Sequence, residues 1–187
     1  MILVFDTETT STYNDARIMQ LAFKVVDLEG KTLHEKAAYI HPGENDFKVN
    51  PFAFAVHKIT QEMCVSMGEP IKDVLEEFFT YAGKSNVVVA HNLEFDRRMV
   101  NQELKLNNLK GMVPSGIRFY CSMQGTKALV GATDKLGRRK APKLAELHRF
   151  LFDSDFEGAH NAFHDVEATT KCVLELYNRG LTPPDFL

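Results

Sequence analysis

Short apolar runs separated by polar residues open the chain and predict β-strands. Met1–Phe5 is a continuous apolar run of strand length, which is typical of a buried strand. Ile18–Val26 and Lys31–Ile40 predict two further strands, and the turn residues Glu29 and Gly30 lie between them. We therefore expect these two strands to pair as a hairpin, with the first strand beside it.

Beyond the hairpin, most apolar residues recur at the three- and four-residue spacing of amphipathic helices. Val87–Val89 is a further short apolar run and predicts one more buried strand. Helices are predicted for four segments: Ile71 to Phe79 with Pro70 in the first turn, the residues after Val89 through Leu104, Lys143–Phe152, and Val166 to Tyr177 with a stop at Gly180. The polar segments His41–Pro51 and Gly131–Pro142 are predicted to be loops.

This order of elements indicates the α/β class. An initial group of strands, followed by strands that helices separate, is typical of a mixed sheet with helices packed on it. A length of 187 residues suits one domain, and we expect a single domain over residues 1–187.

The composition excludes several classes of protein. The 22 lysines and arginines against 25 aspartates and glutamates give a net charge of −3, which excludes a uniformly basic nucleic-acid coat protein but allows a local basic patch. No apolar run approaches the roughly 20 residues of a membrane span, and the first residues lack the basic lead of a secretory signal. The three cysteines are far apart and form no CxxC pair, so we expect neither a disulfide framework nor a structural zinc site, and we predict a reducing, cytoplasmic location.

Two carboxylates lie at the end of the first predicted strand. Asp6 and Glu8 are separated by one residue, so in a strand both side chains point to one face, about 7 Å apart. Two like charges in this position repel each other unless a cation lies between them. Oxygen ligands favour Mg²⁺ or Mn²⁺ over zinc. The alternative is a solvated strand end that holds no metal.

Two further acidic residues follow later segments. Asp96 lies shortly after the Val87–Val89 strand, where ligands gather in open sheets, although an aspartate in an early helical turn also suits a surface position. His160 and Asp165 are five residues apart and converge only if His160 lies in the loop before the helix. A structural histidine is the alternative there, and His164 is expected to face solvent or to pack.

Three segments taken together resemble the exonuclease motifs of the DEDDh family. They are Phe5–Thr10, His91–Asp96, and His160 with four residues before Asp165. This family comprises 3′→5′ exonucleases related to the proofreading subunit of bacterial replicative polymerases. Val56–Thr60 is similar to a further family segment, His-Gly-Ile-Thr. The resemblance covers nearly the whole chain and implies a ribonuclease H-like fold, with a mixed five-stranded sheet flanked by helices.

The resemblance also implies a site and a reaction. Asp6, Glu8, Asp96 and Asp165 would hold two divalent metal ions, Mg²⁺ or Mn²⁺, and His160 would act as the general base. The reaction would release nucleoside 5′-monophosphates from the 3′ end of a nucleic acid, with single-stranded DNA as the favoured substrate.

Substrate contacts are implied for Thr9, near the terminal nucleotide, and for Asn92 and His57 in the substrate cleft. The chain departs from the family pattern at Ser11 and Lys58, where glycine is usual, and at Val166, where alanine is common. None of these departures removes a metal ligand, so they concern the shape of the substrate groove.

A cluster of cations lies between the second and third motifs, in the predicted loop and just after it. Its members are Lys135, Arg138, Arg139, Lys140 and Lys143. We interpret Arg138, Arg139 and Lys140 as contacts to the substrate backbone, since few aromatic residues lie among them for base stacking. The alternative is a solvated loop. Arg97 and Arg98 are interpreted as a surface pair on a helix.

Two other functions remain open. A 3′→5′ exoribonuclease acting on short RNA or RNA tails would share the fold, and a groove that accepts or rejects the 2′-hydroxyl would decide between the two. A non-catalytic nucleic-acid or polymerase-binding module is the third possibility, although such a module has no use for four clustered carboxylates. No polymerase-binding tail is evident, so we expect a stand-alone enzyme and leave a polymerase partner open.

Overall fold

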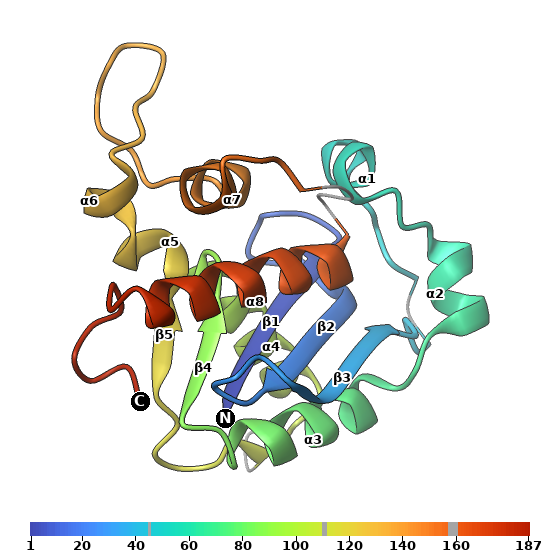
Figure 1. Ribbon diagram of the computed structural model, residues 1–187. Helices are drawn as coiled ribbons and strands as arrows, with labels where there is room; N and C mark the ends of the chain where they lie inside the picture. Colours follow the sequence, from blue (N-terminus) through green and yellow to red (C-terminus); the bar gives the residue numbers. More distant parts are fainter. Residues whose placement is uncertain (45, 110–111, 157–160) are drawn as a thin grey trace.

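The molecule is built around one mixed β-sheet with helices on both faces (Figure 1). The computed structural model describes residues 1–44, 46–109, 112–156 and 161–187. The strands are β1 (Ile2–Thr9), β2 (Ile18–Val26), β3 (Thr32–Tyr39), β4 (Val87–Ala90) and β5 (Phe119–Cys121). They lie in the order β3-β2-β1-β4-β5, which confirms the predicted five-stranded sheet.

The strand directions confirm the predicted hairpin and the mixed character of the sheet. β2 is antiparallel to β1 and to β3, whereas β4 is parallel to β1 and β5 is parallel to β4. β1 continues past its predicted end at Phe5, because Asp6 pairs with Ala22 and Glu8 pairs with Gln20 of β2. β5 was not located by the sequence pattern, since three residues are too few to show a period.

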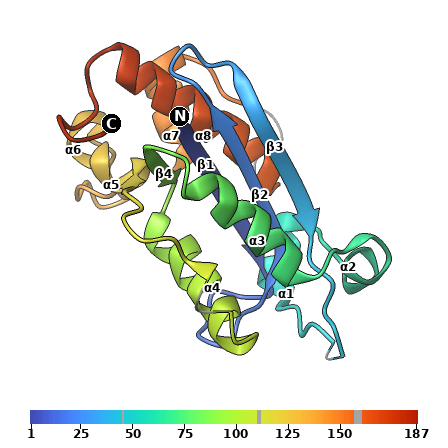
Figure 2. The same cartoon turned by 90° about the horizontal axis from the view of Figure 1, so that it is seen from below.

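Helices cover both faces of this sheet. They are α1 (Pro51–His57), α2 (Gln61–Met67), α3 (Ile71–Ala82), α4 (Leu93–Leu106), α5 (Ser122–Gly125), α6 (Lys127–Val130), α7 (Leu144–Phe152) and α8 (Ala162–Asn178). Figure 2 shows α7 and α8 on one side of the sheet and α3 and α4 on the other. The helices α3, α4, α7 and α8 were predicted, and Gly180 follows α8 with a φ of +67°. The prediction that Pro70 lies in the first turn of α3 is wrong, because Pro70 is the N-cap and precedes that turn.

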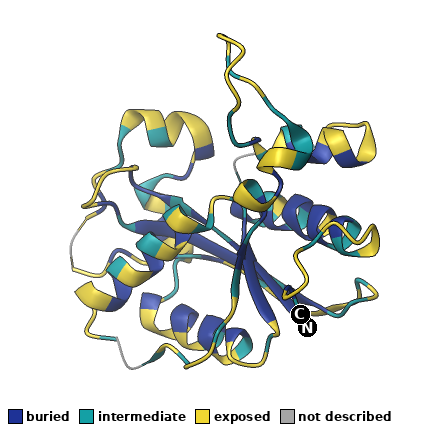
Figure 3. Ribbon diagram, turned by 90° about the vertical axis from the view of Figure 1, so that its left-hand side faces the viewer, coloured by how far each residue is buried: buried dark blue, intermediate teal, exposed yellow. Residues whose placement is uncertain are grey.

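Alternation along β1 divides the core into two layers. Ile2 and Val4 pack with residues of α8, whereas Leu3 and Phe5 pack with residues of α3 and α4. β1, β2 and β4 are almost wholly buried, and Figure 3 shows this buried centre between helices whose outer surfaces are exposed. By the same period of two, Asp6 and Glu8 turn toward α8, and Thr7 between them turns toward α4.

Within the described parts of the chain, no helix is long and apolar enough to cross a membrane. Cys64, Cys121 and Cys172 are free thiols. The single domain over residues 1–187 stays a prediction.

Candidate active site

Three carboxylates meet where β1 ends. Asp6 and Glu8 project from β1 toward α8, and Asp165 lies in the first turn of that helix. One oxygen from each of these side chains lies within 4.8 Å of the others. The start of α8 is capped by Asn161, whose side chain accepts a hydrogen bond from the Phe163 amide at 3.1 Å. The structure thus places both strand carboxylates on one face, as the strand period predicts, and adds a third from the helix.

Asp96 reaches the same strand end from the opposite face of the sheet. It lies in the first turn of α4 and is 2% exposed. Its Oδ1 accepts hydrogen bonds from the Thr7 amide at 3.0 Å and from the Thr7 hydroxyl at 2.8 Å. Because Thr7 lies between Asp6 and Glu8 in β1, these bonds hold Asp96 beside the other acids. We missed this role of Thr7 in the sequence, although the period of β1 already turns its side chain toward the other face.

The carboxylates disfavour one another's charged forms. Burial and the neighbouring acidic charges, Asp96 foremost, hold the pKa of Asp6 well above its usual range. Burial and the charges of Asp165 and Asp96 raise the pKa of Glu8 to about 8. Burial also raises the pKa of Asp96 to about 7, although the hydrogen bonds from Thr7 lower it. A bound cation relieves this repulsion, and a donor set made only of carboxylate oxygens fits a hard dication such as Mg²⁺.

Helix α1 is fixed to the end of β1 by both of its ends. At its start, the Asn50 amide donates to the Thr10 carbonyl at 2.8 Å. At its end, His57 Nε2 lies 3.2 Å from the Thr9 carbonyl oxygen, and burial lowers the pKa of this imidazole. Thr9 and His57, both predicted to contact substrate, therefore touch each other. Thr9 is the residue that follows Glu8 in the chain.

The remaining predicted residues lie at the edge of the cluster or outside the described residues. Asn92 is exposed and is the N-cap of α4, with a φ of +82°. His164 is exposed, as predicted, and its ring centre is 6.1 Å from that of Phe163. His160, the predicted general base, lies outside the described residues, so its place at the site stays a prediction.

His91 connects the end of β4 to two other segments. Its Nδ1 lies 3.0 Å from Ser122 Oγ, and its Nε2 lies 3.1 Å from the Pro142 carbonyl oxygen. Burial lowers the pKa of His91 to about 4, so the ring is neutral near pH 7. Because a carbonyl only accepts, Nε2 carries the proton and Nδ1 accepts from the Ser122 hydroxyl. His91 therefore attaches the end of the loop Gly131–Pro142, called the basic loop below, to the strand that leads to Asp96.

The basic loop projects from the body of the molecule between α6 and α7 (Figure 1). Arg138 forms an ion pair with Asp134 at 2.8 Å, and Lys140 forms one with Glu146. Arg139 is exposed and has no ion pair within the described residues. Of the three cations that we interpret as backbone contacts, Arg139 is thus the one available to a phosphate without first leaving an acid.

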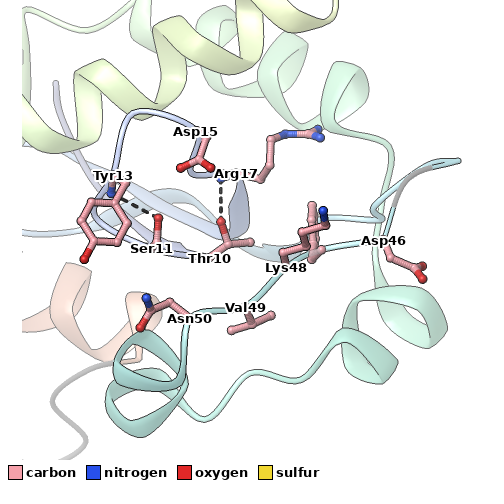
Figure 4. Close-up of a pocket in the computed structure, with 10 residues that line it drawn as sticks. Thr10, Ser11, Tyr13, Asp15, Arg17, Asp46, Lys48, Val49 and Asn50 are labelled. Atoms are coloured by element: carbon pink, nitrogen blue, oxygen red, sulfur yellow. Dashed lines mark hydrogen bonds between the residues drawn. The ribbon is translucent and has the colours of Figure 1, made fainter.

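A hollow of about 380 Å³ opens beside the end of β1 (Figure 4). Its walls are the loop that follows β1 and the segment that precedes α1. Figure 4 shows Tyr13, Ser11 and Asn50 around it. The Tyr13 side chain is 67% exposed and presents an aromatic ring at the rim. Since Thr10 and Ser11 line the hollow and directly follow β1, the hollow offers polar and aromatic surface beside the end of that strand.

Comparison with known proteins identifies the family. Residues 3–173 match the family described as Exonuclease. The chain is 28% identical over 182 residues to the DNA polymerase III subunit epsilon of Buchnera aphidicola, which covers 92% of this chain and 70% of the relative. It is 32% identical over 100 residues to exodeoxyribonuclease 10 of Escherichia coli K12, which covers 54% of this chain and 40% of the relative.

Solved structures share the fold. The nuclease domain of 3′hExo, a DEDDh family member bound to rAMP, superposes with a TM-score of 0.75 at 14% identity, over 96% of this chain and 92% of that one. Escherichia coli exonuclease I with a dA16 oligonucleotide gives 0.77 at 18% identity, over 96% of this chain and 41% of that one. The chain therefore spans less than half of either Escherichia coli enzyme. The chain belongs to the exonuclease family, and its ribonuclease H-like fold is shared by a solved DEDDh family member.

Proposed function

We propose that this exonuclease releases nucleoside 5′-monophosphates from the 3′ end of single-stranded nucleic acid, DNA foremost. The observation that carries the proposal is the convergence of Asp6, Glu8 and Asp165, with Asp96 held beside them by Thr7. Exonucleases of this family depend on metal ions, and bound cations would relieve the repulsion among these acids. We assign residues 1–187 to one catalytic domain.

Asp6, Glu8, Asp96 and Asp165 would hold two divalent ions, Mg²⁺ or Mn²⁺. When bound, such ions activate a water and neutralise the charge that develops on the leaving 3′ oxygen. Both hydrogen bonds from Thr7 go to Oδ1 of Asp96, which leaves Oδ2 as a ligand. Thr7 thus positions Asp96 without occupying the oxygen that coordination needs.

His160 is proposed to accept the proton of the attacking water. As the water oxygen bonds to phosphorus, the bond from phosphorus to the 3′ oxygen breaks, and the 3′ oxygen then takes up a proton. An imidazole with an ordinary pKa of about 6.5 suits this role near neutral pH.

Replacing His160 with alanine is expected to lower kcat by about 100-fold, because a positioned general base contributes about 10²- to 10⁴-fold. The control is His164→Ala, since this neighbouring imidazole is exposed. A folded His160→Ala variant that keeps the parent rate would exclude His160 as the base.

The substrate class is inferred from the ligands of the two solved structures and from the epsilon subunit of DNA polymerase III. The structures above hold a dA16 oligonucleotide in one case and rAMP in the other. The epsilon relative is a DNA polymerase subunit and aligns with 92% of this chain, which favours DNA and makes a polymerase a possible partner. We place the enzyme in the reducing cytoplasm, which its three free thiols support.

The test uses 3′-labelled oligonucleotides of equal length as single-stranded DNA, duplex DNA and RNA, each with Mg²⁺. Mononucleotide release that is fastest from single-stranded DNA and stops with EDTA is the expected result. Faster release from RNA would establish the exoribonuclease instead. Binding of all three substrates without release would show a non-catalytic binding module.

Neutralising Arg138, Arg139 and Lys140 with glutamine is expected to weaken substrate binding at low salt. Each lost phosphate contact lowers the slope of log affinity against log salt by about 0.7 for a single strand. Arg139→Gln alone should give most of the change, because the other two cations are already paired with acids. Lys31→Gln, in the turn between β2 and β3, is the matched control. An unchanged slope in the triple variant would remove the loop from the substrate path.

A further inference from the structure

Lys58 has a backbone conformation that a lysine rarely adopts. It ends α1 with φ +60° and ψ +13°, in the left-handed region. Four non-glycine residues of the described chain have a positive φ, and the other three are Asn92, Asn108 and Asp153. Asparagine and aspartate tolerate this region because their short polar side chains bond to the neighbouring backbone, which a lysine side chain does not do. Lys58 is therefore the strained member of the set.

The Lys58 side chain is presented outward on an aromatic ring. Its Nζ lies 5.8 Å from the centre of the Phe54 ring, one helical turn earlier. Both residues are exposed, and Lys58 has no ion pair within the described residues. A cation beside an exposed aromatic ring suits a single nucleic-acid strand, whose phosphates attract the cation and whose bases stack on rings.

Lys58 lies near the end of β1, the strand that carries Asp6 and Glu8. The preceding residue, His57, contacts the Thr9 carbonyl, and Thr9 directly follows Glu8. Figure 1 shows α1 above the end of β1 and beside the start of α8, the helix that carries Asp165. The end of α1 therefore lies where it could meet a strand whose 3′ end is bound at the carboxylates.

The fold itself does not need a lysine at this position. Glycine or asparagine would end α1 in the same conformation with less strain. A cation does favour a helix C-terminus, but this effect is small at an exposed end, and α1 has only seven residues. Strain that the fold does not require points to a use of the side chain outside the fold.

We propose that Lys58 contacts a backbone phosphate of the substrate strand near its 3′ end and thereby helps to set the affinity of this exonuclease for single strands. This proposal rests on the proposed function, since it concerns the same substrate. It assigns a binding role to Lys58 and leaves the chemical step to the carboxylates.

The test compares Lys58→Gly, Lys58→Asn and Lys58→Arg with the parent on a single-stranded oligonucleotide with Mg²⁺. The glycine and asparagine variants suit the left-handed backbone but lack the cation, whereas arginine keeps the cation. Lys31→Asn, at the end of the sheet remote from the carboxylates, is the control for the loss of one positive charge. KM and kcat are measured at several salt concentrations, and Tm is measured for every variant.

The expected result is a KM raised about 5- to 10-fold in Lys58→Gly and Lys58→Asn, with kcat unchanged, and a salt slope lower by about 0.7. Lys58→Arg and Lys31→Asn should keep the parent KM, and no Lys58 variant without the cation should have a lower Tm. An unchanged KM and slope, or a loss of affinity that follows a fall in Tm, would overturn the proposal. A parent protein that releases no nucleotide would instead refute the proposed function.

Discussion

Exchange of Asp165 for asparagine is expected to reduce nucleotide release by at least about 1,000-fold, since the metal ions of a two-metal site supply several kcal/mol of transition-state stabilisation. Asparagine keeps the size of the side chain and the helical start of α8, so the fold should persist. Asp6→Asn should give a loss of the same order, because its carboxylate lies within 4.8 Å of those of Glu8 and Asp165. Single-turnover release from a 3′-labelled oligonucleotide measures both effects.

The control for this loss is Glu167→Gln on the same helix. Glu167 forms an ion pair with Lys24 and does not belong to the carboxylate cluster, so its exchange should leave the rate near that of the parent. A folded Asp165→Asn protein that digests the oligonucleotide as fast as the parent would show that the cluster is not the reaction centre.

The metal-free protein is expected to lose stability as pH rises from about 5 to 8. The pKa of Glu8 is raised to about 8 and that of Asp96 to about 7, so the folded chain holds protons that the unfolded chain has already released. Since the folded state then binds more protons, the free energy of unfolding falls with pH across this window. Each unit by which a pKa is raised corresponds to about 1.4 kcal/mol.

Metal binding should reverse this trend. At pH 8, saturation with Mn²⁺ is expected to raise Tm by about 10–20 °C, because each of the two sites, filled to 100 times its Kd, adds about 2.7 kcal/mol, and 1 kcal/mol corresponds to about 2–4 °C at this chain length. At pH 5 the gain should be small, since Glu8 and Asp96 are still protonated there. Scanning calorimetry with EDTA and with Mn²⁺ at both values of pH measures the difference.

Glu8→Gln provides the sharper comparison. Removal of one repelling charge should raise the Tm of the EDTA-treated protein at pH 8 by several degrees, while it decreases the gain from Mn²⁺ and abolishes nucleotide release. Stability and activity would then change in opposite directions in one variant. A Glu8→Gln protein that is less stable than the parent without metal would contradict the electrostatic account of the cluster.

Much of the site follows from local patterns in the sequence. The period of β1 alone puts Asp6 and Glu8 on one face, and the same period turns Thr7 to the other. The helices that the apolar spacing predicts are those with a buried stripe. By contrast, α1 hides only His57 and exposes Phe52 at 84%, so no stripe marks it as a helix.

Other features depend on contacts between distant segments, which no local pattern contains. The bond from Thr7 to Asp96 spans 89 residues and requires that α4 pack on a particular face of β1. The contact of His91 with Pro142 spans 51 residues. The ion pairs that occupy Arg138 and Lys140 are closer in sequence, but they become visible only when the loop is folded.

Anomalous diffraction from a crystal soaked in Mn²⁺ tests the central claim most directly. We predict two peaks about 3.5–4 Å apart, as in other two-metal sites, with ligand oxygens from Asp6, Glu8, Asp96 and Asp165. A well-ordered cluster with no peak among these four carboxylates, or with manganese bound only elsewhere, would contradict it.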